Sequence, residues 1–193
     1  NDFRYSSEGL VSALAQVRYM QGRLLGQMQG LGFSLRAEAL LTTLTLDVLK
    51  STEIEGEILN KEQVRSSIAR RLGVNVSGMV NSTRDVDGVV EMMLDATQRY
   101  NEPLSHERWF GWHAALCPTG WSGMYRIEVG KYRTGEMQVV SGAMGKERVH
   151  YEAPKPEIVS DEMEKFLSWF NHESSLDSVI KAAIAHLWFI TIH

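Results

Sequence analysis

Apolar residues recur at intervals of three or four through most of the chain, which is the spacing of an amphipathic helix. Asn60 is a suitable N-cap for one such stretch and Gly73 a suitable end. Thr83 or Asp85 is placed to start another, and Ser105 a third. The pattern predicts helices over Leu10–Met28, Ala37–Leu49, Lys61–Leu72, Val86–Tyr100, Asp161–Phe170 and Ser178–His193, with a further helix beginning at Ser105.

The texture changes between residues 125 and 152. The runs Arg126–Val129 and Met137–Val140 are short and β-like, and Val149 and Tyr151 follow the small, Gly-rich stretch Ser141–Gly145. This arrangement predicts one antiparallel hairpin. The predicted fold class is therefore mainly α with one β-hairpin. The small, polar stretch Asn75–Ser82 suggests a boundary, with an N-terminal helical region at residues 1–80 and a second region at residues 81–193.

Composition narrows the class of protein. The 193 residues are 44% hydrophobic and carry a net charge of −4, so the chain can bury a sizeable core and does not bind nucleic acid through bulk charge. A single cysteine, Cys117, excludes an internal disulfide and fits a reducing compartment. No apolar run approaches the roughly 20 residues that span a bilayer. The expectation is a cytoplasmic protein that does not enter the membrane.

The last twelve residues form an apolar helix that has no closing signal. The stretch Ala182–His193 reads AAIAHLWFITIH and ends without Gly, Asn or a run of Lys and Arg. The last carbonyls of a helix need partners, which such residues usually supply or arrange. We therefore expect this chain, which also begins at Asn1 rather than Met, to be a piece of a longer protein whose function depends on further residues.

The acidic stretch Ser51–Glu57 has two interpretations. In the first it is a capping box, in which Thr52 accepts a backbone hydrogen bond and Glu55, three residues later, returns one. That interpretation leaves unexplained why an acidic run is directly followed by Gly56. In the second interpretation the stretch has a functional role. The hairpin also has two interpretations. Its exposed strand edge could pair with an extended peptide of a partner, although a structural hairpin on a helical core is commoner.

Two further patterns could form a DNA-binding or a metal site. Residues 62–80 resemble the two helices and the turn of a helix-turn-helix, with Arg65, Arg70 and Arg71 placed to face phosphates, but an ordinary helical hairpin gives the same pattern. His186 and His193 are seven residues apart, too far for the i,i+4 pair of a zinc helix. No Cys, His and Asp cluster indicates a metal site, and neither a Walker loop nor a G-x-S-x-G elbow is present.

Four separated stretches together resemble the Fic family, in the family's order. Ser51-Thr52-Glu53-Ile54-Glu55-Gly56 resembles the N-terminal inhibitory motif [S/T]-x-x-x-E-[G/N]. Gly130–Gly142, followed by Val149–Pro154, is similar to the family's flap hairpin. Ala185–His193 resembles the approach to the motif H-P-F-x-[D/E]-G-N-G-R-x-x-R, with His193 as its first residue. Trp112–Gly120 is also similar, except that Cys117 stands where the family has an aromatic residue.

The resemblance implies a Fic-like helical bundle with one β-hairpin flap, acting as a protein adenylyltransferase. Its substrate would be ATP with Mg²⁺, and AMP would move to a hydroxyl of a target protein bound through the flap. His193 would be the general base, because a hydroxyl needs one near neutral pH. Glu55, with Ser51 and Gly56, would form the inhibitory motif, and its carboxylate would hold a motif arginine away from the γ-phosphate.

The resemblance also implies nucleotide contacts from Glu55 and from the flap residues Val139, Val140, Ser141, Gly142 and Ala143. His193, Glu55 and Val139–Ala143 are then expected to share one cleft. The phosphate-binding part of the motif and its metal-binding acid would follow His193, so the chain as printed is expected to be inactive. The reverse reaction, removal of AMP, and a homodimer are left open. The alternative from another class is a non-catalytic helical module that binds a protein through the hairpin, or DNA through Lys61–Val80.

Overall fold

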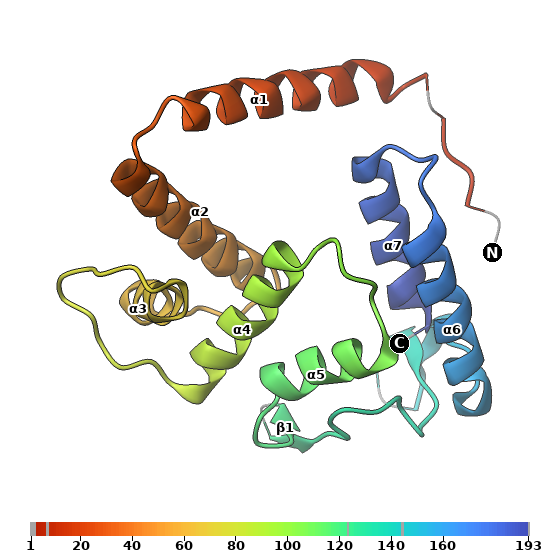
Figure 1. The fold of residues 1–193 in the computed structure, drawn as a ribbon. Coiled ribbons are helices and arrows are strands. Elements are labelled where there is room, and N and C mark those ends of the chain that lie inside the picture. Colours follow the sequence, from red (N-terminus) through yellow and green to blue (C-terminus); the bar gives the residue numbers. More distant parts are fainter. Residues whose placement is uncertain (1–2, 7, 123, 144, 193) are drawn as a thin grey trace. The chain divides into compact units, whose positions relative to one another are not determined.

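The computed structural model describes residues 3–6, 8–122, 124–143 and 145–192. The chain forms two compact units (Figure 1). The N-terminal unit comprises Asn1–Tyr100 and Ala115–Pro118, and the C-terminal unit comprises Asn101–Ala114 and Thr119–His193. The domain boundary expected near residue 80 stays a prediction.

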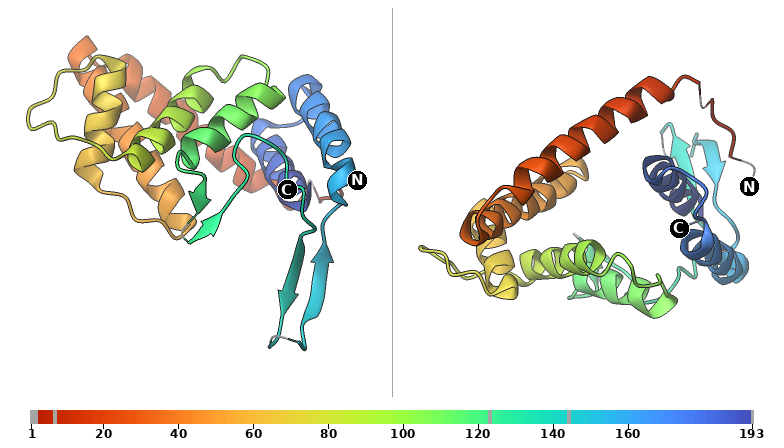
Figure 2. Two further views of the ribbon diagram at one scale, coloured as in Figure 1. Left: turned by 90° about the horizontal axis from the view of Figure 1, so that it is seen from below. Right: turned by 45° about the horizontal axis from the view of Figure 1, so that its top comes forward.

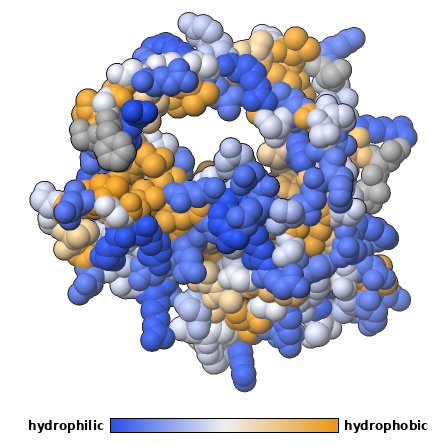
Figure 3. Space-filling view, viewed as in Figure 1, coloured by the Kyte–Doolittle hydropathy of each residue, from blue (hydrophilic) through white to orange (hydrophobic). Residues whose placement is uncertain are grey.

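Among its described residues, the N-terminal unit has helices and no strands. The helices are α1 (Val11–Gln29), α2 (Phe33–Ile54), α3 (Lys61–Leu72) and α4 (Arg84–Gln98). Helix α3 contacts both α2 and α4, and the core between these three consists of Leu41, Leu44, Val48, Val64, Ile68, Ala69, Val86 and Val90. No residue of α1 is buried, and Figure 3 shows apolar side chains at the surface over α1 and α2. The predicted helical spacing of α1 is therefore correct, but its apolar residues are not core.

Capping residues set the ends of α3 and the start of α4. The Asn60 side chain accepts a hydrogen bond from the Gln63 amide at 3.1 Å, and Gly73 ends α3 in the left-handed conformation with a φ of 66°. The Thr83 hydroxyl accepts from the Val86 amide at the start of α4. These contacts satisfy backbone groups that have no partner inside a helix, so the sequence predicted these ends correctly.

The helix-turn-helix prediction is wrong. Residues 74–83, all of which are described, contain no helix. Val74 and Val76 lie against the core of the unit, and the three arginines expected to face phosphates are used within the protein. Arg65 binds Glu38 at 3.0 Å, Arg70 donates to the Val80 carbonyl and the Ser82 hydroxyl, and Arg71 binds Asp87. All three arginines therefore have partners within the N-terminal unit.

Asp87 is the centre of the hydrogen bonds that hold this loop. Its Oδ1 accepts from the Ser67 hydroxyl at 2.5 Å, from the Ser82 hydroxyl at 2.7 Å and from Arg71 Nη1 at 3.2 Å. Partial burial raises the pKa of Asp87, but these three hydrogen bonds and the Arg71 charge outweigh it, so its pKa lies below the ordinary value. The carboxylate thus connects α3, the loop and α4.

The C-terminal unit combines helices with two small antiparallel sheets. Its elements are α5 (His106–Leu116, whose last two residues belong to the other unit), β1 (Trp121–Ser122), β2 (Tyr125–Arg126), β3 (Gln138–Ser141), β4 (Arg148–Glu152), α6 (Pro156–His172) and α7 (Ser178–Ile192). Helix α6 packs on α7, and the core consists of Leu104, Val159, Met163, Phe166, Leu167, Ala185 and Ile192. The mainly helical fold class is confirmed.

One predicted strand differs from the structure. Of the β-like run Arg126–Val129 only Arg126 lies in a strand. That strand, β2, pairs with β1 instead of joining the hairpin. The hairpin itself is β3 paired with β4, and it extends away from α6 and α7 (Figure 2, left). Two-residue strands carry no alternation of polar and apolar residues, so periodicity could not detect β1. None of the described helices combines the length and the apolar character that a membrane span requires.

Replacing Asp87 with Asn should destabilise the N-terminal unit by about 1 kcal/mol at neutral pH, because an amide accepts these hydrogen bonds less strongly and the site is partly exposed. The pKa of Asp87 is lowered on folding, so its stabilisation is complete above the ordinary value of 3.8 and is lost as pH falls through the lower folded value. Urea unfolding of both proteins at several pH values measures this, with Asp47→Asn on the exposed face of α2 as the control. A difference that persists unchanged below pH 2, roughly two units under the ordinary pKa, would contradict the assignment.

Candidate functional site

The acidic stretch lies at the C-terminal end of α2, so the capping-box interpretation is wrong. Thr52 is inside the helix, and its hydroxyl donates to the Val48 carbonyl at 2.9 Å instead of accepting from a backbone amide. The Gly56 amide donates to the Glu53 carbonyl at 3.1 Å, and the Glu57 amide donates to the Thr52 carbonyl at 2.9 Å. This is the Schellman arrangement, with Glu55 as the C-cap and Gly56 in the left-handed region at a φ of 86°.

This helix end is acidic and exposed. Glu53, Glu55 and Glu57 are all exposed, and the neighbouring Ile54 and Ile58 have exposed fractions of 82% and 91%. Negative side chains at a helix C-terminus oppose the helix dipole, and exposed isoleucines add no burial. Lys50 neutralises part of this charge through a 2.5 Å contact with Glu53. The side chain of Glu55 has no hydrogen bond or ion pair with any other described residue. This end of α2 is thus not explained by local stability.

The hairpin presents an open, apolar strand edge. Every residue of β3 and β4 is exposed, including Val139 at 57% and Val140 at 46%. A bulge follows Val139 and leaves His150 without a partner in the register, and its Nε2 contacts the Ser141 hydroxyl at 2.6 Å. Gly142 has a φ of 113°, and a Cβ there would lie 2.7 Å from the Lys146 carbonyl oxygen, so the tip of the hairpin requires glycine.

Two side chains of the hairpin region bind the end of α7. The Tyr151 hydroxyl donates to the Thr191 carbonyl at 2.6 Å, and Arg133 Nη2 donates to the Ile192 carbonyl at 3.1 Å. Arg133 also donates to the Pro154 carbonyl at 2.5 Å and to the Gly135 carbonyl at 2.8 Å. Both donors are distant from α7 in the sequence, so no local pattern could have identified Arg133 and Tyr151 as partners of this helix.

The segment that precedes Arg133 is itself anchored. Tyr132 contacts His106 Nδ1 of α5 through its hydroxyl, and His106 Nε2 contacts Glu164 of α6 at 2.6 Å. Partial burial, with the negative charges of Glu164 and Glu107, raises the pKa of Tyr132 to about 12. Its phenol therefore stays protonated at neutral pH. This chain of contacts fixes the backbone next to Arg133 against two helices.

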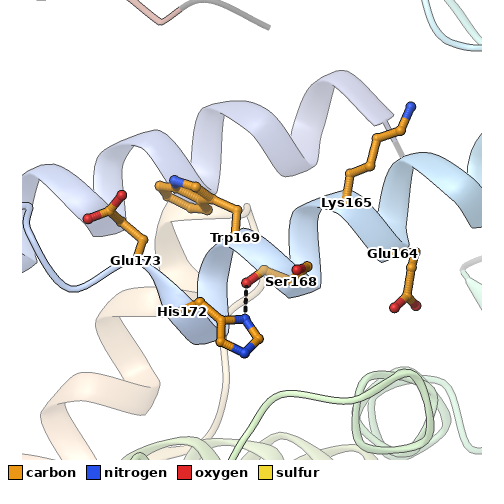
Figure 4. Close-up of a pocket in the computed structure, with 6 residues that line it drawn as sticks. All are labelled: Glu164, Lys165, Ser168, Trp169, His172 and Glu173. Atoms are coloured by element: carbon orange, nitrogen blue, oxygen red, sulfur yellow. Dashed lines mark hydrogen bonds between the residues drawn. The ribbon is translucent and has the colours of Figure 1, made fainter.

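The described residues of this unit line surface hollows, of which two concern the site. The larger, about 660 Å³, runs along α6 and is lined by Glu164, Lys165, Ser168, Trp169, His172 and Glu173 (Figure 4). In it His172 Nδ1 donates to the Ser168 carbonyl at 2.7 Å, which is an ordinary contact within a helix. A smaller hollow, about 350 Å³, is lined by His113, Ile127, Glu128, Lys131, Arg133, Thr134 and Gly135. The first hollow is larger, but only the second includes Arg133, which binds α7 and both sides of the hairpin. The second hollow is therefore the better candidate for a functional site.

The predicted site residues are distributed over both units. Val139, Val140 and Ser141 are on β3, Gly142 and Ala143 follow them, and Thr191 and Ile192 are bound to this hairpin region. Ser51, Glu55 and Gly56 belong to the N-terminal unit. His193 lies outside the described residues, so the shared cleft stays a prediction. The described residues include no group of three or more His, Cys, Asp or Glu side chains that could hold a metal ion.

Comparison with known proteins finds a matching family model for each of two parts of the chain. Residues 103–193 match the model of the Fic/DOC family. Residues 1–74 match the domain of unknown function DUF4172. A search of curated proteins finds no match. The resemblance to the Fic family seen in the sequence is therefore confirmed.

A solved Fic structure shows the same fold. The crystal structure of a Fic family protein from Desulfovibrio desulfuricans G20 aligns with 99% of this chain at a TM-score of 0.60 and 23% identity. The alignment covers 53% of that protein, so the present chain spans about half its length. The Fic-like helical fold with a small hairpin is thus supported by a structure as well as by the family match.

Replacing Gly56 with Ala should cost about 1 kcal/mol, because a Cβ is strained at a positive φ. No atom lies within 4 Å of the added Cβ, so the cost comes from the backbone alone. Gly26→Ala in α1, where the added Cβ also meets no atom within 4 Å, is the matched control and should not lower stability. Urea unfolding followed by circular dichroism measures both. Equal effects of the two substitutions would contradict the Schellman assignment.

Proposed function

We propose that the full-length protein is an adenylyltransferase that moves AMP from ATP to a hydroxyl side chain of a target protein. The observation that carries the proposal is the attachment of the hairpin to the end of α7 by Tyr151 and Arg133. It joins an open strand edge to the position that precedes His193. The family match over residues 103–193 supports the same chemistry.

The hairpin is suited to binding an extended segment of the target. Unpaired backbone groups on a strand edge form hydrogen bonds with an added strand, and neighbouring apolar side chains favour the contact. The exposed Val139 and Val140 lie on the strand that precedes the tip of the hairpin. We expect this strand addition to bring the target hydroxyl to Val139–Ala143, where the triphosphate is also held.

His193 is assigned as the general base. Histidine has an ordinary pKa of about 6.5, so its neutral form can accept a proton near pH 7. The hydroxyl oxygen attacks the α-phosphorus, its proton moves to His193, and the bond to the bridging oxygen breaks to release pyrophosphate. As the resemblance implies, we assign the Mg²⁺ ligand to the acidic residue of the Fic motif.

Glu55 is assigned as an inhibitory residue. Its carboxylate is exposed, unpaired among the described residues, and fixed to a rigid helix end by the Schellman hydrogen bonds. Such a carboxylate is suited to binding an arginine in a bidentate manner. By holding an arginine of the Fic motif, Glu55 would keep that arginine from the γ-phosphate and would repel the triphosphate. This role accounts for the acidic, exposed end of α2.

Two substitutions in the full-length protein test this function. Glu55→Gly should raise AMP transfer, and His193→Ala should lower it by at least about a hundredfold while ATP affinity stays near that of the parent. Glu57→Gly removes a neighbouring exposed glutamate and should leave the rate unchanged. Incorporation of labelled AMP, with thermal unfolding of each variant, measures these effects. A folded Glu55→Gly protein that binds ATP and transfers no more AMP than Glu57→Gly would remove the inhibitory role, and an active His193→Ala protein would remove the assigned base.

A further inference from the structure

Two side chains from outside α7 bind its last described turn. A helix leaves its last carbonyls without partners inside the helix. Here the Thr191 carbonyl accepts from Tyr151 at 2.6 Å and the Ile192 carbonyl from Arg133 at 3.1 Å. Both are consecutive carbonyls, and both donors come from outside the helix. The final turn of α7 is therefore fixed by the hairpin region.

Arg133 binds the hairpin and the helix at the same time. Its guanidinium contacts the Gly135 carbonyl before β3, the Pro154 carbonyl after β4 and the Ile192 carbonyl of α7. A guanidinium is planar and permanently charged, and its donors point in fixed directions. A lysine has one nitrogen and cannot reproduce this set of contacts. One side chain thus sets the distance between both ends of the hairpin and the last turn of α7.

The Ile192 carbonyl belongs to the peptide group that joins Ile192 to His193. A peptide group is planar, so a hydrogen bond that fixes this carbonyl also restricts the bond leading to residue 193. A general base must lie within hydrogen-bonding reach of the proton that it accepts, about 2.6–3.2 Å between heavy atoms. A displacement of about 1 Å can reduce the rate about a hundredfold. The two donors are therefore placed to control the alignment of the base.

We propose that Arg133 and Tyr151 are positioning residues, which hold the base at residue 193 in register with the strand that presents the target hydroxyl. The proposal rests on the proposed function. The base and the strand share one anchor, so the distance between hydroxyl and base does not depend on each being placed separately. Tyr132, bound to His106 and through it to Glu164, fixes the backbone from which Arg133 extends.

The test uses Tyr151→Phe and Arg133→Lys in the full-length protein, because each keeps most of the side chain. Their matched controls are Tyr100→Phe and Arg84→Lys, both exposed and in the N-terminal unit. We expect kcat for AMP transfer to fall about tenfold or more in the two test variants, with the KM for ATP within about twofold of the parent. The controls should keep the parent values of both constants.

Hydrogen exchange over the end of α7 gives a second readout that needs neither ATP nor target. Loss of an anchor should speed exchange of the backbone amides in the last turn, and leave α6 unchanged. Parent-like exchange in both test variants overturns the proposal. A fall in kcat with an equal rise in the KM for ATP and a lower melting temperature also overturns the proposal, because that combination indicates general destabilisation. If the parent itself transfers no AMP, the proposed function fails, and faster exchange then shows an anchor that serves no adenylyl transfer.

Discussion

Two consecutive carbonyls of α7, those of Thr191 and Ile192, accept hydrogen bonds from donors outside the helix, and the arrangement of the C-terminal unit depends on these donors. Arg133 and Tyr151 supply them, and Arg133 at the same time binds the residues on both sides of the hairpin. Hydrogen bonds from a charged donor contribute about 1.5–3 kcal/mol when well formed. The open hairpin, which buries none of its own residues, is thereby held at a fixed place relative to α7. The same contacts bring the two parts of the proposed site together.

The sequence predicted those features that local chemistry determines. Helix α3 has the predicted ends because Asn60 and Gly73 satisfy backbone groups within a few residues. Of the two interpretations of Thr52-x-x-Glu55, the capping box is wrong, because this pattern lies at the C-terminal end of α2 and Gly56 ends the helix there. The second helix of the helix-turn-helix alternative is a loop in the structure. Its valines pack on the core, and Arg70 and Asp87, which lie outside the loop, hold it through hydrogen bonds. Tertiary contacts also cap α7, and no local pattern reveals them.

In the N-terminal unit, a loop held by tertiary contacts differs from a helix end that is left exposed. Its loop at 73–83 is tied down by Asp87 and by arginines, whereas the C-terminal end of α2 carries three exposed glutamates and two exposed isoleucines. That end opposes the helix dipole and buries little, so folding alone does not account for it. The proposed binding of an arginine of the Fic motif would account for it. In that proposal the Schellman turn at Gly56 holds Glu55 in place.

The central claim is that the end of α7 and the hairpin together form a site for AMP transfer. A crystal structure of the full-length protein with a non-hydrolysable ATP analogue tests it most directly. The account predicts that the triphosphate lies beside Val139–Ala143, with the ring of His193 facing a position about 3–3.5 Å from the α-phosphorus where a hydroxyl can attack in line. A nucleotide bound more than roughly 20 Å from the hairpin, farther than an ATP-sized site extends, would contradict the account.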